Sequence, residues 1–480
     1  MVSVVCFFVS FQALGQGIES MQTAREESQI FLGILLFSIN LTVSCSSIYY
    51  AISKDGVSLR VVYWFYSLVF MGLAPLIQGW IGVWRHGFDY ALLLNLSLII
   101  FFSHVFFLTG YTPASRIWRK RIMQRFIGAA DETEGYTRRK VYVDSNKLLL
   151  FSVIALIISI TTSIIFGFHF TSSIIRTMFG FTYSPAESMA EFFFRPFLFF
   201  VFIFCLYAVI HGYRKLSLKV SLICLFFSVF LIVGPLSGAR SIIFFMYFGA
   251  IVVIARKKLV RYPWLFGGSL FGGVFASELQ NLFRSFLIDG EDFALAGINY
   301  FFQGHFDGFE MFGHTISYVS GQGVEFGAQL LGALFFWFPR SVWVEKPIGS
   351  GDFIAYEHIA TFATVDFANF SMPLVAEAYL NFGLLGVCLS FFLLGWFCGK
   401  EDATFHTTNK LEVNDKISNM SEPLWMWRYG CALGIFLFIC RGDLQSGMSF
   451  MTGIFLALTC AWLMFHGWSP RLNEHSRQLT

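Results

Sequence analysis

The stretch PLVAEAYLNFGLLGVCLSFFLLGWFC, residues 373–398, decides the class of fold. Glu377 is its only charged residue, and the run exceeds the roughly 20 apolar residues that an α-helix needs to cross a bilayer. Of the 480 residues in the chain, 56% are hydrophobic and only 13% are charged, a balance unsuited to a soluble protein with a polar surface. Because a helix satisfies its own backbone hydrogen bonds in lipid, the sequence predicts an all-α polytopic membrane protein.

Similar apolar runs recur along the whole chain, and we expect about eleven transmembrane helices, within a range of about 10 to 12. The predicted spans are residues 30–52, 61–82, 90–111, 148–167, 192–211, 218–235, 241–255, 264–283, 373–398, 425–441 and 448–467. A shorter apolar run over residues 1–20 lacks the basic flank and cleavage site of a secretory signal. It is either an extra partial span or an artefact of start-site choice, with translation then beginning at Met21.

Lysines and arginines indicate the orientation, because short cytoplasmic loops are enriched in them. A basic loop over residues 112–147 follows the third predicted span, and two further basic clusters lie at residues 214–219 and 256–261. Alternation of the spans places all three clusters on one side, which is therefore predicted to be cytoplasmic. One loop disagrees, because residues 400–424 are slightly acidic although alternation places them on the same side.

The same alternation places one long segment, residues 285–372, outside the cell membrane. This segment carries ten carboxylates but only Arg340 and Lys346 as bases, a bias that fits the outer side. The sequence thus predicts three regions: N-terminal transmembrane helices (1–284), a large outer loop (285–372) with short or interfacial helices, and C-terminal transmembrane helices (373–480).

Both outer bases belong to one aromatic sequence, FWFPRSVWVEKPIGSG, residues 336–351. The planar fork of Arg340 and the point charge of Lys346 suit a phosphorylated head group. Gly349 and Gly351 let the backbone approach a ligand closely. An equally weighted interpretation is an amphipathic segment on the bilayer surface, with the cations on lipid phosphates and the tryptophans at the head-group level.

Further charged residues lie at the predicted outer ends of different spans, where charge is costly unless it is paired or functional. The arginines of this set suggest a shared outward-facing cavity, whereas any single one is explained by snorkelling or by an ion pair such as Arg441 with Asp443. The set consists of Arg195, Arg240, Glu278, Arg284, Glu377, Arg441 and Asp443.

Several reaction classes are not indicated by any motif. The nine cysteines are scattered in or beside apolar runs, and the sequence contains no phosphate-binding loop, dinucleotide fingerprint, HExxH or DxD pair. We therefore expect no cofactor, no metal and no nucleotide-dependent reaction. Basic residues flank the spans instead of forming one stripe, so we expect no nucleic-acid partner.

Two features inside the spans have structural and functional interpretations. His104 in FFSHVFFL is either a catalytic histidine of the acyltransferase kind or, as we prefer, a histidine hydrogen-bonded between helices. The spacing of Gly268 and Gly272 in GGSLFGG predicts close helix packing.

A polytopic chain with FPRSVWVEKPIGSG in a large outer loop, followed by NFSMPLVAEAYLNFGLLG, resembles the Wzy-type O-antigen and oligosaccharide repeat-unit polymerases of bacteria. The sequence-level resemblance covers about 50 residues, from 335 to 386, and includes the spacing of ten residues between Arg340 and Gly351. It implies a GT-C-like membrane glycosyltransferase in the bacterial inner membrane, with its active site facing the periplasm.

The resemblance also implies the substrates and the roles of residues. A growing glycan on undecaprenyl pyrophosphate is transferred to a new lipid-linked repeat unit, and the implied partners are membrane lipid and a polysaccharide chain-length regulator. Cations would stabilise the lipid pyrophosphate leaving group, and a carboxylate or histidine would accept the proton of the acceptor hydroxyl. The candidate cations are Arg340, Lys346, Arg284, Arg240 and Arg441, and the candidate bases are Glu377, Asp366 and His358.

Two other functions use the same lipid-linked substrate. A flippase would also need arginines, but alternating access favours internal repeats and midplane charges, which the sequence does not display. An O-antigen ligase would transfer the glycan to lipid A core and would use outer-loop arginines with a histidine. The glycan ladder of a deletion strain separates the three functions.

Overall fold

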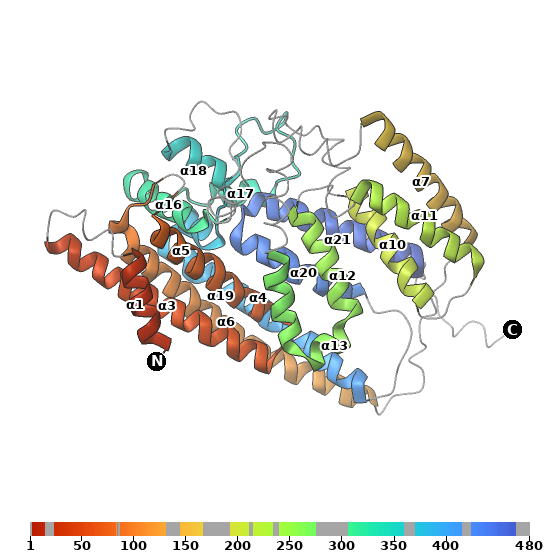
Figure 1. Cartoon of the computed structure of the whole chain (residues 1–480), viewed down its shortest axis with the longest axis horizontal. Coiled ribbons are helices and arrows are strands. Elements are labelled where there is room, and N and C mark those ends of the chain that lie inside the picture. The colour runs from red at the N-terminus through yellow and green to blue at the C-terminus, as the bar shows by residue number, and fades with distance from the viewer. Residues whose placement is uncertain are drawn as a thin grey trace. The chain divides into compact units, whose positions relative to one another are not determined.

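The computed structural model describes residues 2–14, 24–82, 84, 87–130, 145–166, 193–210, 215–233, 240–274, 306–359, 370–414 and 424–466. All regular structure in these residues is helical, and none of them forms a strand (Figure 1). The predicted all-α class is therefore confirmed for this part of the chain. The helices are α1 (Val2–Leu14), α3 (Ala24–Lys54), α4 (Leu59–Leu68), α5 (Ala74–Ile81), α6 (Leu93–Ala130), α7 (Ser145–Phe166), α10 (Arg195–Ile210), α11 (Leu216–Val233), α12 (Arg240–Ile254), α13 (Arg256–Arg261), α16 (Gly308–Gln322), α17 (Ala328–Leu334), α18 (Ser350–His358), α19 (Leu374–Asn414), α20 (Leu424–Arg441) and α21 (Leu444–His466). A π-helical turn (Val69–Leu73) joins α4 to α5, a 3₁₀ turn (Tyr90–Leu92) precedes α6, and residues 263–274 are also helical.

Among the described residues, six helical stretches are long and apolar enough to cross a membrane. The chain is accordingly a multi-pass membrane protein. The six stretches are Glu26–Lys54, Leu59–Ile81, Tyr90–Gln124, Leu374–Asn409, Leu424–Arg441 and Leu444–Phe465, and each coincides with a predicted span. Four of the other predicted spans coincide with the shorter or less fully described helices α7, α10, α11 and α12. The last predicted span, residues 264–283, is helical over its described part, which ends at residue 274.

The apolar run at the start of the chain forms helix α1. Its 13 residues extend about 20 Å, less than the roughly 30 Å of hydrocarbon that a complete span must cross. Helix α1 packs on α3 and α5: Phe7 meets Phe31 at 6.0 Å between ring centroids, and Ala13 and Leu14 are fully buried. Residues 2–14 thus have the length and the packing of a partial span.

The chain forms two compact units. The first comprises Met1–Glu132, Ile251–Asn414 and Tyr429–Met451, and the second comprises Thr133–Ala250, Asp415–Arg428 and Thr452–Thr480. In the second unit α7 packs on α11 and α11 packs on α10. The first unit contains the described part of the outer segment and all the sites below.

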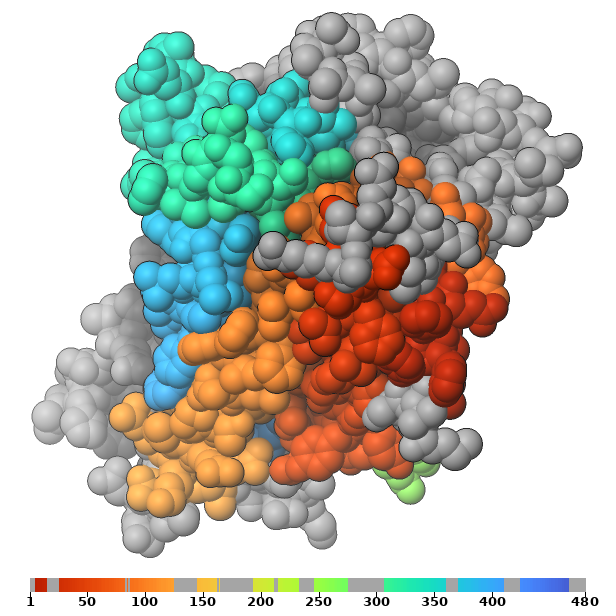
Figure 2. Space-filling model, turned by 90° about the vertical axis from the view of Figure 1, so that its left-hand side faces the viewer, coloured from red at the N-terminus to blue at the C-terminus, as the bar shows by residue number. Residues whose placement is uncertain are grey.

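The first unit is organised around the pair α6 and α19, which lie side by side (Figure 2). Glycines on both helices allow this approach, because a Cβ atom added at Gly395 would overlap Phe107 O and one added at Gly110 would overlap Phe392 O. Gly399, one turn beyond Gly395, lies in the same way against Tyr111 O. Backbones in such close contact gain dispersion energy without needing a hydrophobic force.

For the glycine pair that the sequence suggested for close packing, a Cβ atom at Gly268 or Gly272 would meet no described atom within 4 Å. Close packing at these two residues stays a prediction. Among the described helices, the small-residue spacing that brings two backbones together is the one at Gly395 and Gly399.

His104 is held between helices, as the preferred interpretation of the sequence expects. Its Nδ1 lies 2.8 Å from Tyr63 Oη and its Nε2 lies 3.1 Å from Ser67 Oγ, while Ser67 also bonds to Ser44 Oγ at 2.7 Å. Both ring nitrogens are thus occupied, and the side chain is buried. A satisfied polar network of this kind fixes the register of α3, α4 and α6.

The acidic segment that conflicted with the predicted orientation is largely helical. Helix α19 continues to Asn414, well beyond the end of the predicted span at residue 398, and Asp402 is buried. Its carboxylate accepts hydrogen bonds from Leu59 N at 2.8 Å, from Tyr111 Oη at 3.0 Å and from Tyr429 Oη at 2.7 Å. Asp402 thereby caps the first turn of α4. Its carboxyl group serves helix packing and is not part of an exposed loop.

The two ends of the α6–α19 pair differ in chemistry. At one end Lys400 lies over the Trp118 ring, with its Nζ 5.3 Å from the ring centroid, and Arg256 Nη1 donates to Asn409 Oδ1 at 3.0 Å. Two of the basic clusters therefore meet there. At the other end α16 and α17 of the outer segment pack on the start of α19 (Figures 1 and 2). The two ends are separated by the 36 residues of Leu374–Asn409, in which Phe382 and Gly383 interrupt the helical backbone with a kink.

Candidate functional site

Arg340 forms hydrogen bonds with backbone carbonyls of its own aromatic segment, residues 336–351. Its Nη1 donates to Lys346 O at 2.6 Å and its Nη2 donates to Pro347 O at 3.2 Å. The side chain is otherwise exposed. A guanidinium carries five N–H donors, so the two carbonyl bonds leave three N–H groups without a partner among the described residues. Arg340 is thus fixed by its own loop and keeps donors for a ligand.

The ammonium group of Lys346 also bonds to backbone carbonyls of this segment. It is buried, and its Nζ donates to Phe336 O and, at 3.1 Å, to Phe338 O. Burial, followed by the neighbouring charge of Arg340, lowers the pKa of Lys346 from its usual range. A pyrophosphate would have to compete with the two carbonyls for the ammonium group. The role predicted for Lys346 in binding pyrophosphate therefore stays a prediction, and the described contacts are those that shape the loop.

The glycines after this loop permit a close approach, but to protein groups. A Cβ atom at Gly349 would lie 2.6 Å from Asp443 Oδ2, and one at Gly351 would lie 2.5 Å from Phe370 O. The amide of Gly351 donates to Asp443 Oδ2 at 3.3 Å. The first turn of α18 is therefore pressed against the residue that precedes α21.

Glu377 lies in the first turn of α19, where three elements meet. Ser350 Oγ donates to its Oε2 at 2.6 Å, and Leu444 N donates to its Oε1 at 3.0 Å. The residue is 2% exposed. Asn381, one turn further, binds Glu377 O at 2.8 Å through Nδ2. Each carboxylate oxygen already accepts a hydrogen bond, so Glu377 joins α18, α19 and the start of α21.

Two aspartates adjoin this junction. Asp443 Oδ1 accepts from Ser446 N at 3.0 Å, so Asp443 caps α21 while its other oxygen meets α18. Burial raises the pKa of Asp443, against the effect of the amides that it accepts. Burial, together with the charge of Asp443, raises the pKa of Asp352 to about 7. Three carboxyl groups thus share a sparsely hydrated region at the start of α18, α19 and α21.

The other predicted cations are not brought to this junction by any described contact. The guanidinium carbon of Arg441 lies 5.4 Å from the centroid of the Phe70 ring, and among the described residues no ion pair joins Arg441 to Asp443. Arg240 begins α12 in the second unit, and its side chain lies outside the described residues. Arg284 and the predicted base Asp366 also lie outside them.

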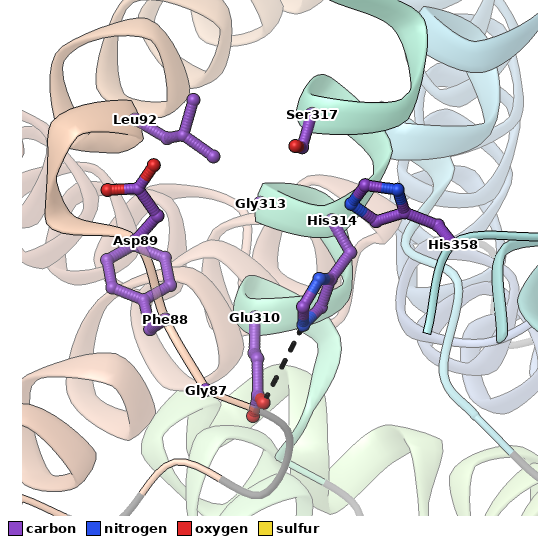
Figure 3. Close-up of a pocket in the computed structure, with 9 residues that line it drawn as sticks. All are labelled: Gly87, Phe88, Asp89, Leu92, Glu310, Gly313, His314, Ser317 and His358. Atoms are coloured by element: carbon purple, nitrogen blue, oxygen red, sulfur yellow. Dashed lines mark ion pairs between the residues drawn. The ribbon is translucent and has the colours of Figure 1, made fainter. Parts of the chain in front are cut away.

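His358 lines a pocket in the outer segment (Figure 3). The pocket has a volume of about 340 Å³, and one wall is α16 while the other is the chain before α6. Figure 3 shows Asp89 and Leu92 facing His314 and Ser317 across it. Its lining residues are Gly87, Phe88, Asp89, Leu92, Glu310, Gly313, His314, Ser317 and His358.

The chemistry of this pocket centres on Glu310 and His314, which lie one helical turn apart. Glu310 Oε1 is 4.0 Å from His314 Nε2, and Glu310 is 1% exposed. The centroids of the His314 and His358 rings are 5.7 Å apart. Burial, with a smaller effect of His358, lowers the pKa of His314 against a hydrogen bond with the Gly87 backbone. The site therefore disfavours the protonated form of His314.

Sequence reasoning named His358 but missed Glu310, His314, Asp89 and Ser317 as site residues. One local signal was present, because EMFGH places a carboxylate and an imidazole four residues apart on one face of a helix. Asp89 lies more than 200 residues away in the chain, and nothing in the sequence links it to α16.

The chain matches no protein-family model, no curated protein and no solved structure. What can be concluded of its class comes from its own helices: a multi-pass, all-helical membrane protein in the part that the structure describes.

Proposed function

We propose that the protein is a membrane glycosyltransferase that polymerises undecaprenyl-pyrophosphate-linked oligosaccharide repeat units on the periplasmic face of the bacterial inner membrane. One observation carries the proposal: Arg340 is held by the carbonyls of its own loop, with three N–H groups unpaired in the part of the chain that the structure describes, at the end of the bundle opposite the basic clusters. A preorganised arginine at the outer surface suits a lipid pyrophosphate. The topology of about eleven spans belongs to the same proposal.

The reaction needs no nucleotide, because the donor carries its own leaving group. The oxygen of the acceptor hydroxyl forms a bond with the anomeric carbon of the donor glycan, and the bond from that carbon to the pyrophosphate oxygen breaks. The hydroxyl proton passes to a base, and undecaprenyl pyrophosphate leaves with the electron pair. Arg340 would stabilise the charge that develops on the pyrophosphate, a contribution worth on the order of a hundredfold or more in rate.

The two described candidates for the base differ in access. Glu377 is almost fully buried, with a hydrogen bond on each oxygen, so a substrate hydroxyl reaches it only if Ser350 or the start of α21 moves. His358 is exposed and lines a pocket. Geometry therefore favours His358 over Glu377, because a base must come within hydrogen-bond reach of the proton it removes.

The pair of histidines in the outer segment keeps the O-antigen ligase as a second candidate. His314 and His358 lie at the same end of the bundle as Arg340, which is the combination a ligase would use. A ligase transfers completed glycan to lipid A core, whereas a polymerase extends the lipid-linked chain.

The test is the surface-glycan ladder of a deletion strain complemented with Arg340→Ala, Arg340→Lys or the wild type. A polymerase leaves a single capped repeat unit on deletion, a ligase leaves free polymer without surface glycan, and a flippase leaves lipid-linked units in the cytoplasm. We expect the single unit from deletion and from Arg340→Ala, with poor rescue by lysine because it lacks the fork. Full ladders from Arg340→Ala at normal protein level would remove this arginine from the mechanism.

A further inference from the structure

Exposed apolar side chains are concentrated in one part of the outer segment, α17 and the loop that follows it. Within residues 306–359, every exposed large apolar side chain lies between residues 326 and 344, and α16 and α18 expose none. Residues 326–339 also contain no charged residue. The exposed side chains are those of Phe326, Leu331, Leu334, Phe335, Trp337, Val342 and Val344. An apolar surface of this kind marks contact with a membrane or with a protein.

The buried side of α17 is fixed to the protein, so its apolar face stays outward. Leu330 N donates to Asn381 Oδ1 at 3.2 Å, which ties α17 to the start of α19. A Cβ atom added at Gly332 would lie 3.0 Å from Pro347 Cβ, so the loop after α17 packs back on the same buried side. The helix cannot turn its exposed leucines inward without losing these contacts.

Phe326 lies in the turn before α17 and points outward from a strained backbone. It is 84% exposed, and its φ of 47° lies in the left-handed region that bulky residues rarely adopt. The turn is held in place, because Glu325 N donates to Leu380 O at 2.9 Å and Tyr318 Oη donates to Glu325 Oε1 at 2.7 Å. Glycine would adopt this φ without strain, so a phenylalanine here indicates a contact for its ring.

The apolar surface continues the lipid-facing side of α19. A Cβ atom at Gly327 would lie 2.7 Å from Phe382 Cζ, so the turn touches Phe382, which is itself exposed. Leu385, Leu389 and Leu393 follow at helical spacing, and all three are exposed on a stretch long and apolar enough to span the membrane. Figure 2 shows the outer segment (green) directly above the first part of α19 (light blue). The lipid that surrounds these leucines therefore adjoins the surface of α17.

We propose that α17 and residues 335–344 lie in the leaflet nearer to Leu374, with Phe326 and Val344 among the acyl chains and Arg340 at the level of the lipid phosphates. Continuity with the lipid face of α19 favours a bilayer over a protein partner. Trp337 beside Arg340 fits the same depth, because tryptophan and arginine are typical of the head-group region. Membrane contact stands without the proposed function. The consequence that Arg340 meets a lipid pyrophosphate from within the leaflet rests on it.

The test measures depth in the bilayer on the full chain in lipid nanodiscs. A fluorescent amino acid is incorporated at one position at a time, in place of Phe326, Val344, Ser341 or Ser320. Ser341 is exposed next to Arg340, and Ser320 is the matched control, exposed on α16 outside the apolar surface. The nanodisc lipids carry a nitroxide quencher either on the acyl chain or on the head group.

We expect acyl-chain nitroxides to quench the labels at Phe326 and Val344 about threefold more strongly than the label at Ser320, because an interfacial segment buries its apolar side chains at the acyl boundary. Head-group nitroxides should quench the label at Ser341 most. Equal quenching at all four positions would overturn the proposal. So would a label at Phe326 with blue-shifted emission that neither lipid quenches, since protein would then cover the surface.

A label at Ser341 that acyl-chain nitroxides quench more than head-group nitroxides would refute the depth assigned to Arg340. Thermal unfolding of each labelled protein verifies folding. Leu334, on the exposed face of α17, replaces Phe326 as the labelled position if the strained turn does not tolerate the label.

The outcomes for the membrane contact and for the proposed function are separable. If lipid quenching is absent while Arg340→Ala abolishes the ladder, the membrane contact fails and the polymerase stands. If quenching follows the expected pattern while the deletion strain keeps a full ladder, the membrane contact stands and the polymerase fails.

Discussion

Replacing Asp352 with asparagine should stabilise the protein at alkaline pH. Burial and the charge of Asp443 raise the pKa of Asp352 to about 7, from 3.8 for the free side chain. One pKa unit corresponds to about 1.4 kcal/mol, so ionised Asp352 lowers the free energy of unfolding at pH 8 by on the order of 4 kcal/mol. Between pH 4 and 7 the folded state keeps a proton that the unfolded chain releases. Stability therefore falls as the pH rises through this window.

Asparagine cannot ionise, so Asp352→Asn should melt several degrees above the wild type at pH 8. At pH 4, where Asp352 is protonated in the folded protein, the two proteins should melt at the same temperature. Thermal unfolding in detergent, at one scan rate and at several pH values, measures the difference. Glu357→Gln is the matched control, because Glu357 is exposed on the same helix. The melting temperature of Asp352→Asn should keep some pH dependence, because burial also raises the pKa of Asp443. An Asp352→Asn variant that melts at or below the wild type at pH 8, or one with the same advantage at pH 4, refutes the reasoning.

Hydropathy predicted where helices occur but not where they end. The predicted span ends at residue 398, yet α19 continues to Asn414 because its polar end has partners: Lys400 lies over Trp118 and Asp402 caps α4. A helix that leaves the apolar layer can continue wherever neighbouring elements satisfy its side chains. An apolar run reveals only the part of a helix that lipid or apolar neighbours surround.

Spacing alone does not reveal which glycines meet another backbone. Gly268 and Gly272 have the same separation as Gly395 and Gly399, but among the described residues only the second pair meets another backbone. Which face of a helix meets a partner depends on the other helices. Sequence reasoning on one helix lacks that information.

The site shows the same limit at longer range. Glu377 was singled out because it follows the outer loop, but its contacts with Ser350 and Leu444 depend on a junction of three elements that no motif encodes. Its neighbour Asp443 was read as a partner for Arg441, and the structure instead gives it the amides of two helices. The sequence thus predicted that charged residues such as Glu377 and Asp443 lie near the same end of the helices. Which donors form hydrogen bonds with these carboxyl groups depends on tertiary packing.

Three further predictions test packing, chemistry and the base. Gly395→Leu should lower the protein level in the membrane and the melting temperature, because its side chain would overlap α6, whereas Gly268→Leu should be tolerated. Purified protein given lipid-linked repeat units should polymerise them in EDTA and without ATP, and strict dependence on a divalent ion would point to another class of glycosyltransferase. Glu377→Gln should lower the melting temperature, because a glutamine offers one acceptor oxygen to the two donors Ser350 Oγ and Leu444 N, and one such hydrogen bond contributes about 0.5–1.5 kcal/mol. If Glu377→Gln instead lowers the rate of polymerisation by roughly two to four orders of magnitude and leaves the melting temperature unchanged, Glu377 is the base. A rate loss of that size is the usual contribution of general-base catalysis.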